Sequence, residues 1–188
     1  MAAAGRIGYP VVAKAISADI PHKTEAGVMA LNINSQDALQ QAYNLILEKA
    51  KANCPDAVLE GVLIQEMVSA QGVETIVGVS REDPFGPAVM FGLGGIFVEI
   101  LKDVAVRILP VSKKDVDDMI GQIQGVGMLQ GARGRKPSDL AALAEVLLKT
   151  ACLADELKGE IAELDINPLI ILEDGRGVKA VDALVLLR

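Results

Sequence analysis

Short apolar runs alternate with longer stretches of helical spacing, and this pattern predicts a chain that mixes strands and helices. Residues 10–16 (PVVAKAI) and 28–33 (VMALNI) have the length and β-branched content of strands, and the polar loop between them predicts a strand pair. From Ser35 to the NCP sequence at 53–55, apolar residues recur at intervals of three and four, which predicts a capped helix. Its predicted apolar face consists of Leu39, Tyr43, Ile46, Leu47 and Ala50.

Turn residues divide the middle of the chain into further strand-like runs, which predict an antiparallel sheet. These runs cover residues 58–68, 73–80, 87–92 and 104–111. Ser112 and Asp115 then fit a capping box, so a helix should begin there. The glycine-rich, basic segment 125–137 predicts a mobile loop.

The last third of the chain predicts one long helix and a closing hairpin. The helix should start at Ser138 and bury Leu143 and Leu147 on one face. Strands at 160–171 and 178–187 should pair around the turn EDGRG. The order of elements indicates an α+β fold with two lobes that meet near residues 66–72, so we expect one lobe at 1–67 and a second at 68–188.

Composition narrows the class of protein. Hydrophobic residues make up 51% of the 188 residues and aromatic residues only 3%, so Val, Ile, Leu and Ala must build the core. The net charge of −7 argues against non-specific binding to nucleic acid or to an anionic membrane. Cys54 and Cys152 have no companion at metal-binding spacing, which favours buried thiols in a reducing compartment. With no run long enough to span a bilayer, the expected location is the cytoplasm.

Three charged residues stand out in or beside apolar strands. Lys14 interrupts an apolar run, which fits either an edge-strand lysine that faces water or a ligand of phosphate. Glu66 and Glu74 taken singly are typical of solvated strand ends. Together they bracket the predicted junction, where carboxylates could accept hydrogen bonds from hydroxyl or amino groups of a ligand.

The most unusual polar group is the sequence ELDINPL. Asp165 and Asn167 alternate with Leu164 and Ile166, so they share one face of a strand. The closing hairpin could place Asp182 beside Asn167. Such oxygen ligands suit Mg²⁺ when phosphate completes its coordination.

Several stretches together resemble the ATP-grasp portion of ADP-forming acyl-CoA synthetases and, more distantly, the β subunit of succinyl-CoA synthetase. They are YPVVAKAISADIPHKTEAGV, GVLIQEMV, ELDINPL and the long segment from GVETIVGVS to VAVRILPV. The resemblance implies an ATP-grasp fold with a nucleotide cleft between two α+β lobes, and Mg²⁺ with ATP or ADP as ligands. It also implies that further residues precede this segment in relatives, so the first lobe is expected to be incomplete at its N-terminus.

The same resemblance implies roles for individual residues. Lys14 matches a phosphate-binding position, and Glu66 and Glu74 match positions that contact the nucleotide. Asn167 and Asp182 match magnesium ligands. Asp165 stands where relatives carry glutamate, and the resemblance implies an acid that lies beside the metal ligands without binding the metal itself.

His22, the single histidine, lies in the polar loop that follows the first predicted strand. A loop histidine on its own is typically solvated. The resemblance implies instead that His22 carries a phosphoryl group, a role that a neutral imidazole can perform near pH 7.

The implied activity is that of an acid–CoA ligase (ADP-forming), which would need a CoA-binding α-type subunit or domain and would form an oligomer. The alternative is a non-catalytic regulatory module, because similar segments are fused to protein acetyltransferases. Retention of Lys14, His22, Asn167 and Asp182 favours the enzyme.

Overall fold

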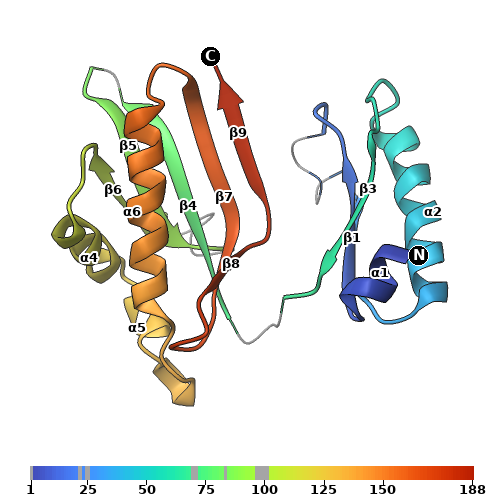
Figure 1. The fold of residues 1–188 in the computed structure, drawn as a ribbon, viewed down its shortest axis with the longest axis horizontal. Coiled ribbons are helices and arrows are strands. Elements are labelled where there is room, and N and C mark those ends of the chain that lie inside the picture. The colour runs from blue at the N-terminus through green and yellow to red at the C-terminus, as the bar shows by residue number, and fades with distance from the viewer. Residues whose placement is uncertain (1, 21–22, 24–25, 69–71, 83, 96–101) are drawn as a thin grey trace. The chain divides into compact units, whose positions relative to one another are not determined.

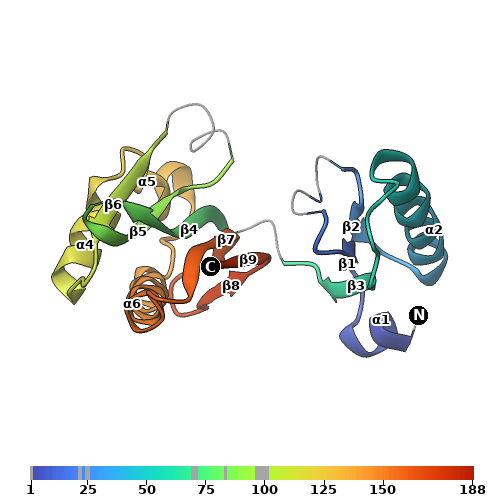
Figure 2. The ribbon, with the colours of Figure 1, turned by 90° about the horizontal axis from the view of Figure 1, so that it is seen from above.

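The chain folds into two compact units, each with its own sheet (Figures 1 and 2). The computed structural model describes residues 2–188 apart from 21–22, 24–25, 69–71, 83 and 96–101. The units are Met1–Met67 and Val68–Arg188, which we call the N-terminal and C-terminal units.

The N-terminal unit is a three-stranded antiparallel sheet with helices α1 (Ala2–Ile7) and α2 (Gln36–Asn53). Strand β1 (Val11–Ile16) lies between β2 (Met29–Ile33) and β3 (Gly61–Glu66). The predicted strand pair is therefore confirmed. The run 58–68, which we expected in the central sheet, instead supplies β3 to this unit, because its alternating Val62 and Ile64 pack on the N-terminal core.

Alternation along β1 decides which face of this sheet packs against α2. Val11 and Ala13 are fully buried and pack with Leu39 and Ile46 of α2 in one core. The predicted cap of α2 is confirmed, since the Ser35 hydroxyl accepts a hydrogen bond from the Ala38 N–H at 3.2 Å. Tyr43, which we expected in the buried face, is 40% exposed.

The C-terminal unit contains a six-stranded antiparallel sheet in which β7 is paired on both sides. The order along the sheet is β6-β5-β4-β7-β8, and β9 also pairs with β7. The strands are β4 (Val73–Glu82), β5 (Gly86–Leu93), β6 (Val104–Ile108), β7 (Ile161–Ile171), β8 (Val178–Ala180) and β9 (Ala183–Leu187).

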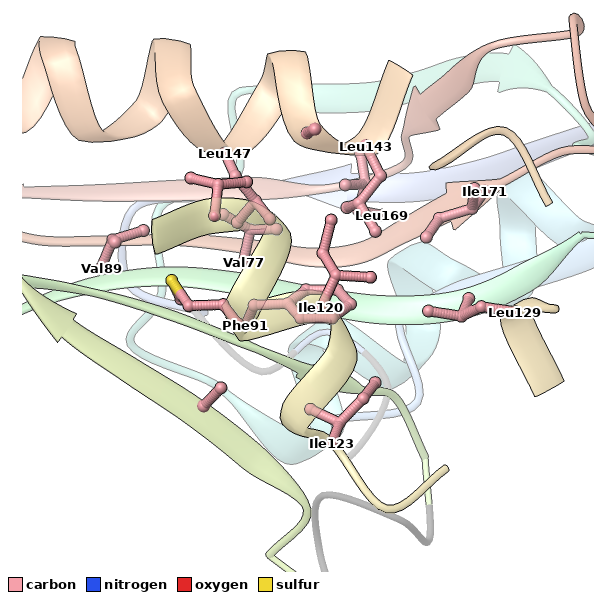
Figure 3. Close-up of a cluster of buried hydrophobic side chains, with 14 of the residues drawn as sticks. Val77, Val89, Phe91, Ile120, Ile123, Leu129, Leu143, Leu147, Leu169 and Ile171 are labelled. Atoms are coloured by element: carbon pink, nitrogen blue, oxygen red, sulfur yellow. The ribbon is translucent and has the colours of Figure 1, made fainter. Parts of the chain in front are cut away.

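Helices of the C-terminal unit gather on one face of this sheet (Figure 1). They are α4 (Lys113–Gln122), α5 (Val126–Leu129) and α6 (Leu140–Glu156), with a short 3₁₀ helix η1 (Ala132–Gly134). Figure 3 shows Phe91 of β5 beneath Ile120 of α4, with Leu147 of α6 in the same cluster. We call the opposite face of each sheet its helix-free face, because no described helix of its unit covers it.

The capping box of α4 is confirmed: the Ser112 hydroxyl and the Asp115 carboxylate each accept a hydrogen bond from the other's backbone N–H. Helix α6 begins at Leu140, two residues later than expected, with Asp139 as its cap. The prediction of a buried thiol is wrong for Cys152, which is exposed on α6.

The segment 125–137 is not the loop that we expected. It contains α5 and η1 and continues into backbone hydrogen bonds from Ser138 N–H to the Leu129 carbonyl (2.8 Å) and from Asp174 N–H to the Pro137 carbonyl (2.9 Å). One of its glycines is required for close packing: a Cβ at Gly131, where φ is +91°, would lie 2.6 Å from the Arg135 carbonyl oxygen.

Among the described residues, no helix combines the length and the apolar character that crossing a membrane requires.

Candidate functional site

The hairpin of β7 with β8 and β9 brings Asn167 and Asp182 opposite each other. Asn167 donates its N–H to the Asp182 carbonyl at 3.1 Å, and Val181 donates to the Pro168 carbonyl at 3.0 Å. Proline has no N–H to offer the ladder, and the register of β7 against β4 shifts at this point. The expected juxtaposition of Asn167 and Asp182 is therefore confirmed, although the closing strand is divided into β8 and β9 beside it.

Asp165 lies next to this pair on the helix-free face, opposite Gly78 of β4. Burial raises the pKa of the Asp165 carboxyl above its ordinary value, the charges of Glu163 and Asp182 raise it further, and a hydrogen bond from Asn167 opposes the rise. Its Oδ1 atom is buried without a hydrogen-bond partner among the described residues. An acceptor left in this state favours the approach of a donor or a cation.

A shallow hollow of about 150 Å³ opens beside Asp165. Its wall includes Gly78, Ser80 and Met90, together with Glu163. A Cβ at Gly78 would approach the Met90 methyl group to 3.2 Å, so glycine keeps this space open. Apart from the glycine in VGVS, no local pattern indicates the hollow, because the three strands that line it meet only in the folded sheet.

The oxygen atoms of this group fit Mg²⁺ better than a softer metal, since they come from two carboxylates and an amide. Among the described residues, no three His, Cys, Asp or Glu side chains form a cluster able to hold a metal. Protein atoms would therefore supply only part of the coordination of Mg²⁺, and phosphate and water would supply the rest.

Lys14 lies on the other sheet, in the central strand β1, opposite Met29 of β2 and Leu63 of β3. Only 5% of Lys14 is exposed, so the alternative of an edge-strand lysine facing water is wrong. Because Ala13 and Ala15 point into the core, Lys14 points to the helix-free face. It is already engaged in an interaction within the protein, so its burial alone does not demand a ligand.

Glu66 and Glu74 are both exposed and belong to different units. Glu66 ends β3 opposite Val11, which places it on the face opposite to that of Lys14. Glu74 lies on the helix-free face of the C-terminal sheet, opposite Ile170. Its carbonyl accepts a hydrogen bond from Gly94 N–H at 2.8 Å, and a Cβ at Gly94 would come within 3.2 Å of the Glu74 backbone.

His22 lies outside the described residues, and its role as a phosphoryl carrier stays a prediction. Described residues on either side of it pack in the N-terminal core. Ile20 is 3% exposed, and Val28 is fully buried and donates its N–H to the Lys23 carbonyl at 3.0 Å.

Comparison with known proteins places these features in a family. The model of the ATP-grasp domain matches residues 1–187. The chain is 46% identical over 185 residues to the β subunit of acetate–CoA ligase (ADP-forming) II of Pyrococcus furiosus, covering 98% of this chain and 78% of the relative. It is 49% identical over 183 residues to the isoenzyme I β subunit of the same organism, covering 97% and 77%.

Solved structures agree. A dinucleotide-forming acetyl-coenzyme A synthetase 1 of Ca. Korarchaeum cryptofilum, in complex with coenzyme A and Ca-AMPCP, matches with a TM-score of 0.94 at 41% identity, over 100% of this chain and 80% of that one. The same enzyme with Mg-AMPPCP, its phosphohistidine segment pointing towards the nucleotide-binding site, matches with a TM-score of 0.84 at 37% identity, with the same coverage. The chain belongs to the ATP-grasp domain family and, within it, to the group that contains the β subunits of ADP-forming acetate–CoA ligases.

Proposed function

We propose that the chain is the nucleotide-binding subunit or domain of an ADP-forming acyl-CoA synthetase, which reversibly converts acyl-CoA, ADP and phosphate into acid, CoA and ATP. The observation that carries the proposal is the group of Asp165, Asn167 and Asp182 on the helix-free face of the C-terminal sheet. Support comes from the named activities of relatives that are 46% and 49% identical. No relative cited above is named as a regulatory module, so the comparisons favour the enzyme over that alternative.

Each candidate residue has a role in this proposal. Asn167 and Asp182 would hold Mg²⁺ together with nucleotide phosphate oxygens, and the ion would supply neutralisation of phosphate charge. Lys14 would position the phosphates through its ammonium group. Glu66 and Glu74 would accept hydrogen bonds from hydroxyl or amino groups of the nucleotide. The two units would thus be the lobes of an ATP-grasp cleft.

His22 would carry the phosphoryl group. A neutral ring nitrogen attacks the phosphorus of the incoming donor, so that a P–N bond forms while the bond to the leaving oxygen breaks. A terminal phosphate oxygen of ADP then attacks the same phosphorus, and the P–N bond breaks to return neutral imidazole and ATP. The phosphoryl donor and the acyl group would be supplied by a CoA-binding α-type subunit or domain, so we also propose that the chain works in a cytoplasmic oligomer.

Calorimetric titration of the chain with ADP and ATP, with and without Mg²⁺, tests nucleotide binding. We expect Mg²⁺ to strengthen binding, and we expect Asp182→Ala to remove that gain because the metal loses a charged ligand. Asp118→Ala, which removes an exposed carboxylate from α4, is the matched control and should bind like the wild type. Magnesium-dependent binding that survives Asp182→Ala would contradict the metal assignment.

Phosphorylation of His22 is tested by supplying acyl-CoA, radioactive phosphate and the CoA-binding partner. A phosphoramidate survives alkali and is lost in acid, so the label on this chain should show both properties and be absent from His22→Asn. If a reconstituted His22→Asn complex made ATP at the wild-type rate, the relay would be wrong while nucleotide binding could still stand.

A further inference from the structure

The last turns of α2 contact the chain shortly after His22. The Asn53 side-chain amide donates to the Ala26 carbonyl at 3.0 Å, across 27 residues of sequence. One helical turn earlier, the Lys49 side chain lies over Gly27: a Cβ at Gly27 would be 3.3 Å from the Lys49 Cδ atom and 3.4 Å from its Nζ atom. Residues four apart on a helix share one face, so both side chains reach the same short segment.

The connection that follows α2 contacts the chain shortly before His22. The Asp19 Oδ2 atom accepts from Val58 N–H at 2.8 Å. The Asp19 N–H in turn donates to the Ser17 hydroxyl at 3.1 Å. A single stretch of chain, residues 49–60, therefore holds the backbone on both sides of the histidine.

The hydrogen bonds of Asp19 and Asn53 differ in character from the apolar contacts of the same region. Ile20 is 3% exposed and Val28 is fully buried, and both belong to the N-terminal core, so they stabilise the fold of the unit. Asp19 and Asn53 are exposed. Water can replace a hydrogen bond made at the surface, so such a bond contributes little to stability. Its main effect is to restrict the backbone that it holds.

We propose that Asn53 and Asp19 are positioning residues for phosphoryl transfer through His22. Transfer requires the phosphorus atom and the attacking oxygen to meet in line, and a small misplacement of either group slows it. Asn53 holds the backbone at Ala26 and Asp19 holds it at the other side, so the two side chains together limit where the imidazole can go. This inference rests on the proposed role of His22 as a phosphoryl carrier.

Transfer from phosphorylated His22 to ADP tests the proposal in this chain alone. Potassium phosphoramidate phosphorylates histidine with release of ammonia, and His22 is the single histidine, so one P–N bond forms. When Mg²⁺ and saturating ADP are added, a terminal oxygen of ADP attacks the phosphorus, the P–N bond breaks and ATP is released. Rapid quenching gives the rate of this step.

Asn53→Asp keeps the shape of the side chain and removes its donor, so it should lower the transfer rate about tenfold. Asn44→Asp is the matched control. Asn44 is exposed on the same helix and accepts a hydrogen bond from Gln40, which a carboxylate can also accept, so this variant should transfer at the wild-type rate. Asp19→Ala should also slow the transfer, and Asp19→Asn, which keeps an acceptor oxygen, should recover most of the lost rate.

Hydrolysis and unfolding separate positioning from a structural role. Loss of the phosphoryl group to water needs no alignment with ADP, so its rate without ADP should be the same in Asn53→Asp and in the wild type. The ADP concentration that gives the half-maximal rate should not change. The urea midpoint followed by tyrosine fluorescence should not change either, since both tyrosines lie in this unit. Slower transfer accompanied by faster hydrolysis or a lower midpoint would overturn the proposal in favour of a structural role.

Failure of this inference and failure of the proposed function give different results. If the phosphorylated wild-type chain binds Mg²⁺ and ADP but makes no ATP, the carrier role of His22 is wrong and the positioning role falls with it. If the wild type makes ATP and Asn53→Asp makes it at the same rate, the carrier role stands and only the positioning role is overturned.

Discussion

The helix-free faces of the two sheets carry opposite charges. In the N-terminal unit this face presents Lys14, which is 5% exposed in the central strand. In the C-terminal unit it presents Asp165, Asn167 and Asp182, with a carboxylate oxygen of Asp165 buried and unpaired among the described residues. Both sheets are antiparallel, and both bury the opposite face under helices.

This difference shows which kind of ligand can bind to each unit. An ammonium group attracts phosphate directly. A carboxylate oxygen repels phosphate, and an amide oxygen does not attract it, unless a cation lies between them. A phosphate group suits the face of the N-terminal unit, and Mg²⁺ suits the face of the C-terminal unit. The comparison therefore supports the proposed division, with phosphate contact in the N-terminal unit and metal contact in the C-terminal unit.

The largest effect should come from breaking one core and leaving the other intact. Phe91 is fully buried in the C-terminal core, which shares no residue with the N-terminal core. Phe91→Ala should lower the free energy of unfolding of the C-terminal unit by about 4 kcal/mol through lost burial and a cavity. Urea unfolding can separate the units, because both tyrosines, Tyr9 and Tyr43, lie in the N-terminal unit and the chain has no tryptophan.

In Phe91→Ala, the unfolding transition seen by tyrosine fluorescence should therefore keep its midpoint, while far-UV circular dichroism should show a transition at a lower urea concentration. Phe85→Ala is the control, since Phe85 is 71% exposed and its loss should change the free energy of unfolding by less than about 0.5 kcal/mol. A tyrosine transition that moves together with the circular dichroism would show that the units unfold as one.

A smaller effect should come from Asp139, which joins α6 to the β7–β8 hairpin. Its Oδ1 accepts from Ala142 N–H at 3.0 Å and its Oδ2 from Gly177 N–H at 2.9 Å. Asp139→Ala should cost about 2 kcal/mol, because it removes a helix cap and leaves a second N–H unpaired. The N-terminal unit has a more exposed counterpart, Asp19, which accepts from Val58 N–H at 2.8 Å, and Asp19→Ala should cost less.

The hydrogen bonds from Ala142 and Gly177 lower the pKa of Asp139 below its ordinary value of 3.8. A lowered folded-state pKa stabilises the fold fully at pH values above the unfolded pKa. This stabilisation is lost as the pH falls below about 3.8 towards the folded pKa. The gap in free energy between wild type and Asp139→Asn should therefore narrow in acid, and a gap that widened would contradict this assignment.

Local sequence signals predicted most of the elements but not their partners. The Ser35 cap and the Ser112–Asp115 capping box lie within a few residues of the helices that they start, so the sequence reveals them. Strand β3 looked like part of the central sheet because its partner β1 is distant in sequence, and only packing on the N-terminal core decides the pairing. The Asn167–Asp182 pair was predictable because a single hairpin turn fixes it.

The polar details that depend on several elements were not predictable. The unpaired Asp165 oxygen is buried where β7 pairs with β4, and no local pattern encodes it. Helix α6 was expected to start at Ser138, whereas Asp139 caps it and its carboxylate also accepts a hydrogen bond from Gly177 across the hairpin. Long-range contacts decided both cases.

Replacing the central lysine tests the N-terminal half of the comparison. Lys14→Met keeps most of the apolar stem and removes the charge, so we expect the fold to remain and ATP affinity to fall about tenfold to a hundredfold. Lys51→Met on the exposed surface of α2 is the control for charge. Unfolding of the Lys14→Met chain would instead indicate that the lysine holds the sheet together through the interaction it already makes.

The smallest expected effects are those of Glu66→Gln and Glu74→Gln, and they separate recognition of the nucleoside from recognition of phosphate. Both side chains are exposed, so neither change should alter the free energy of unfolding by more than about 0.5 kcal/mol. Each should weaken ATP binding about threefold, because a charge-assisted hydrogen bond becomes a neutral one. The affinity for adenosine, measured by competition with ATP, should fall by the same factor. Lys14→Met should leave the affinity for adenosine unchanged. Because a Cβ at Gly94 would come within 3.2 Å of the Glu74 backbone, Gly94→Ala should displace Glu74 and reproduce the Glu74→Gln loss. Unaltered binding by Gly94→Ala would show that the position of Glu74 does not matter for binding.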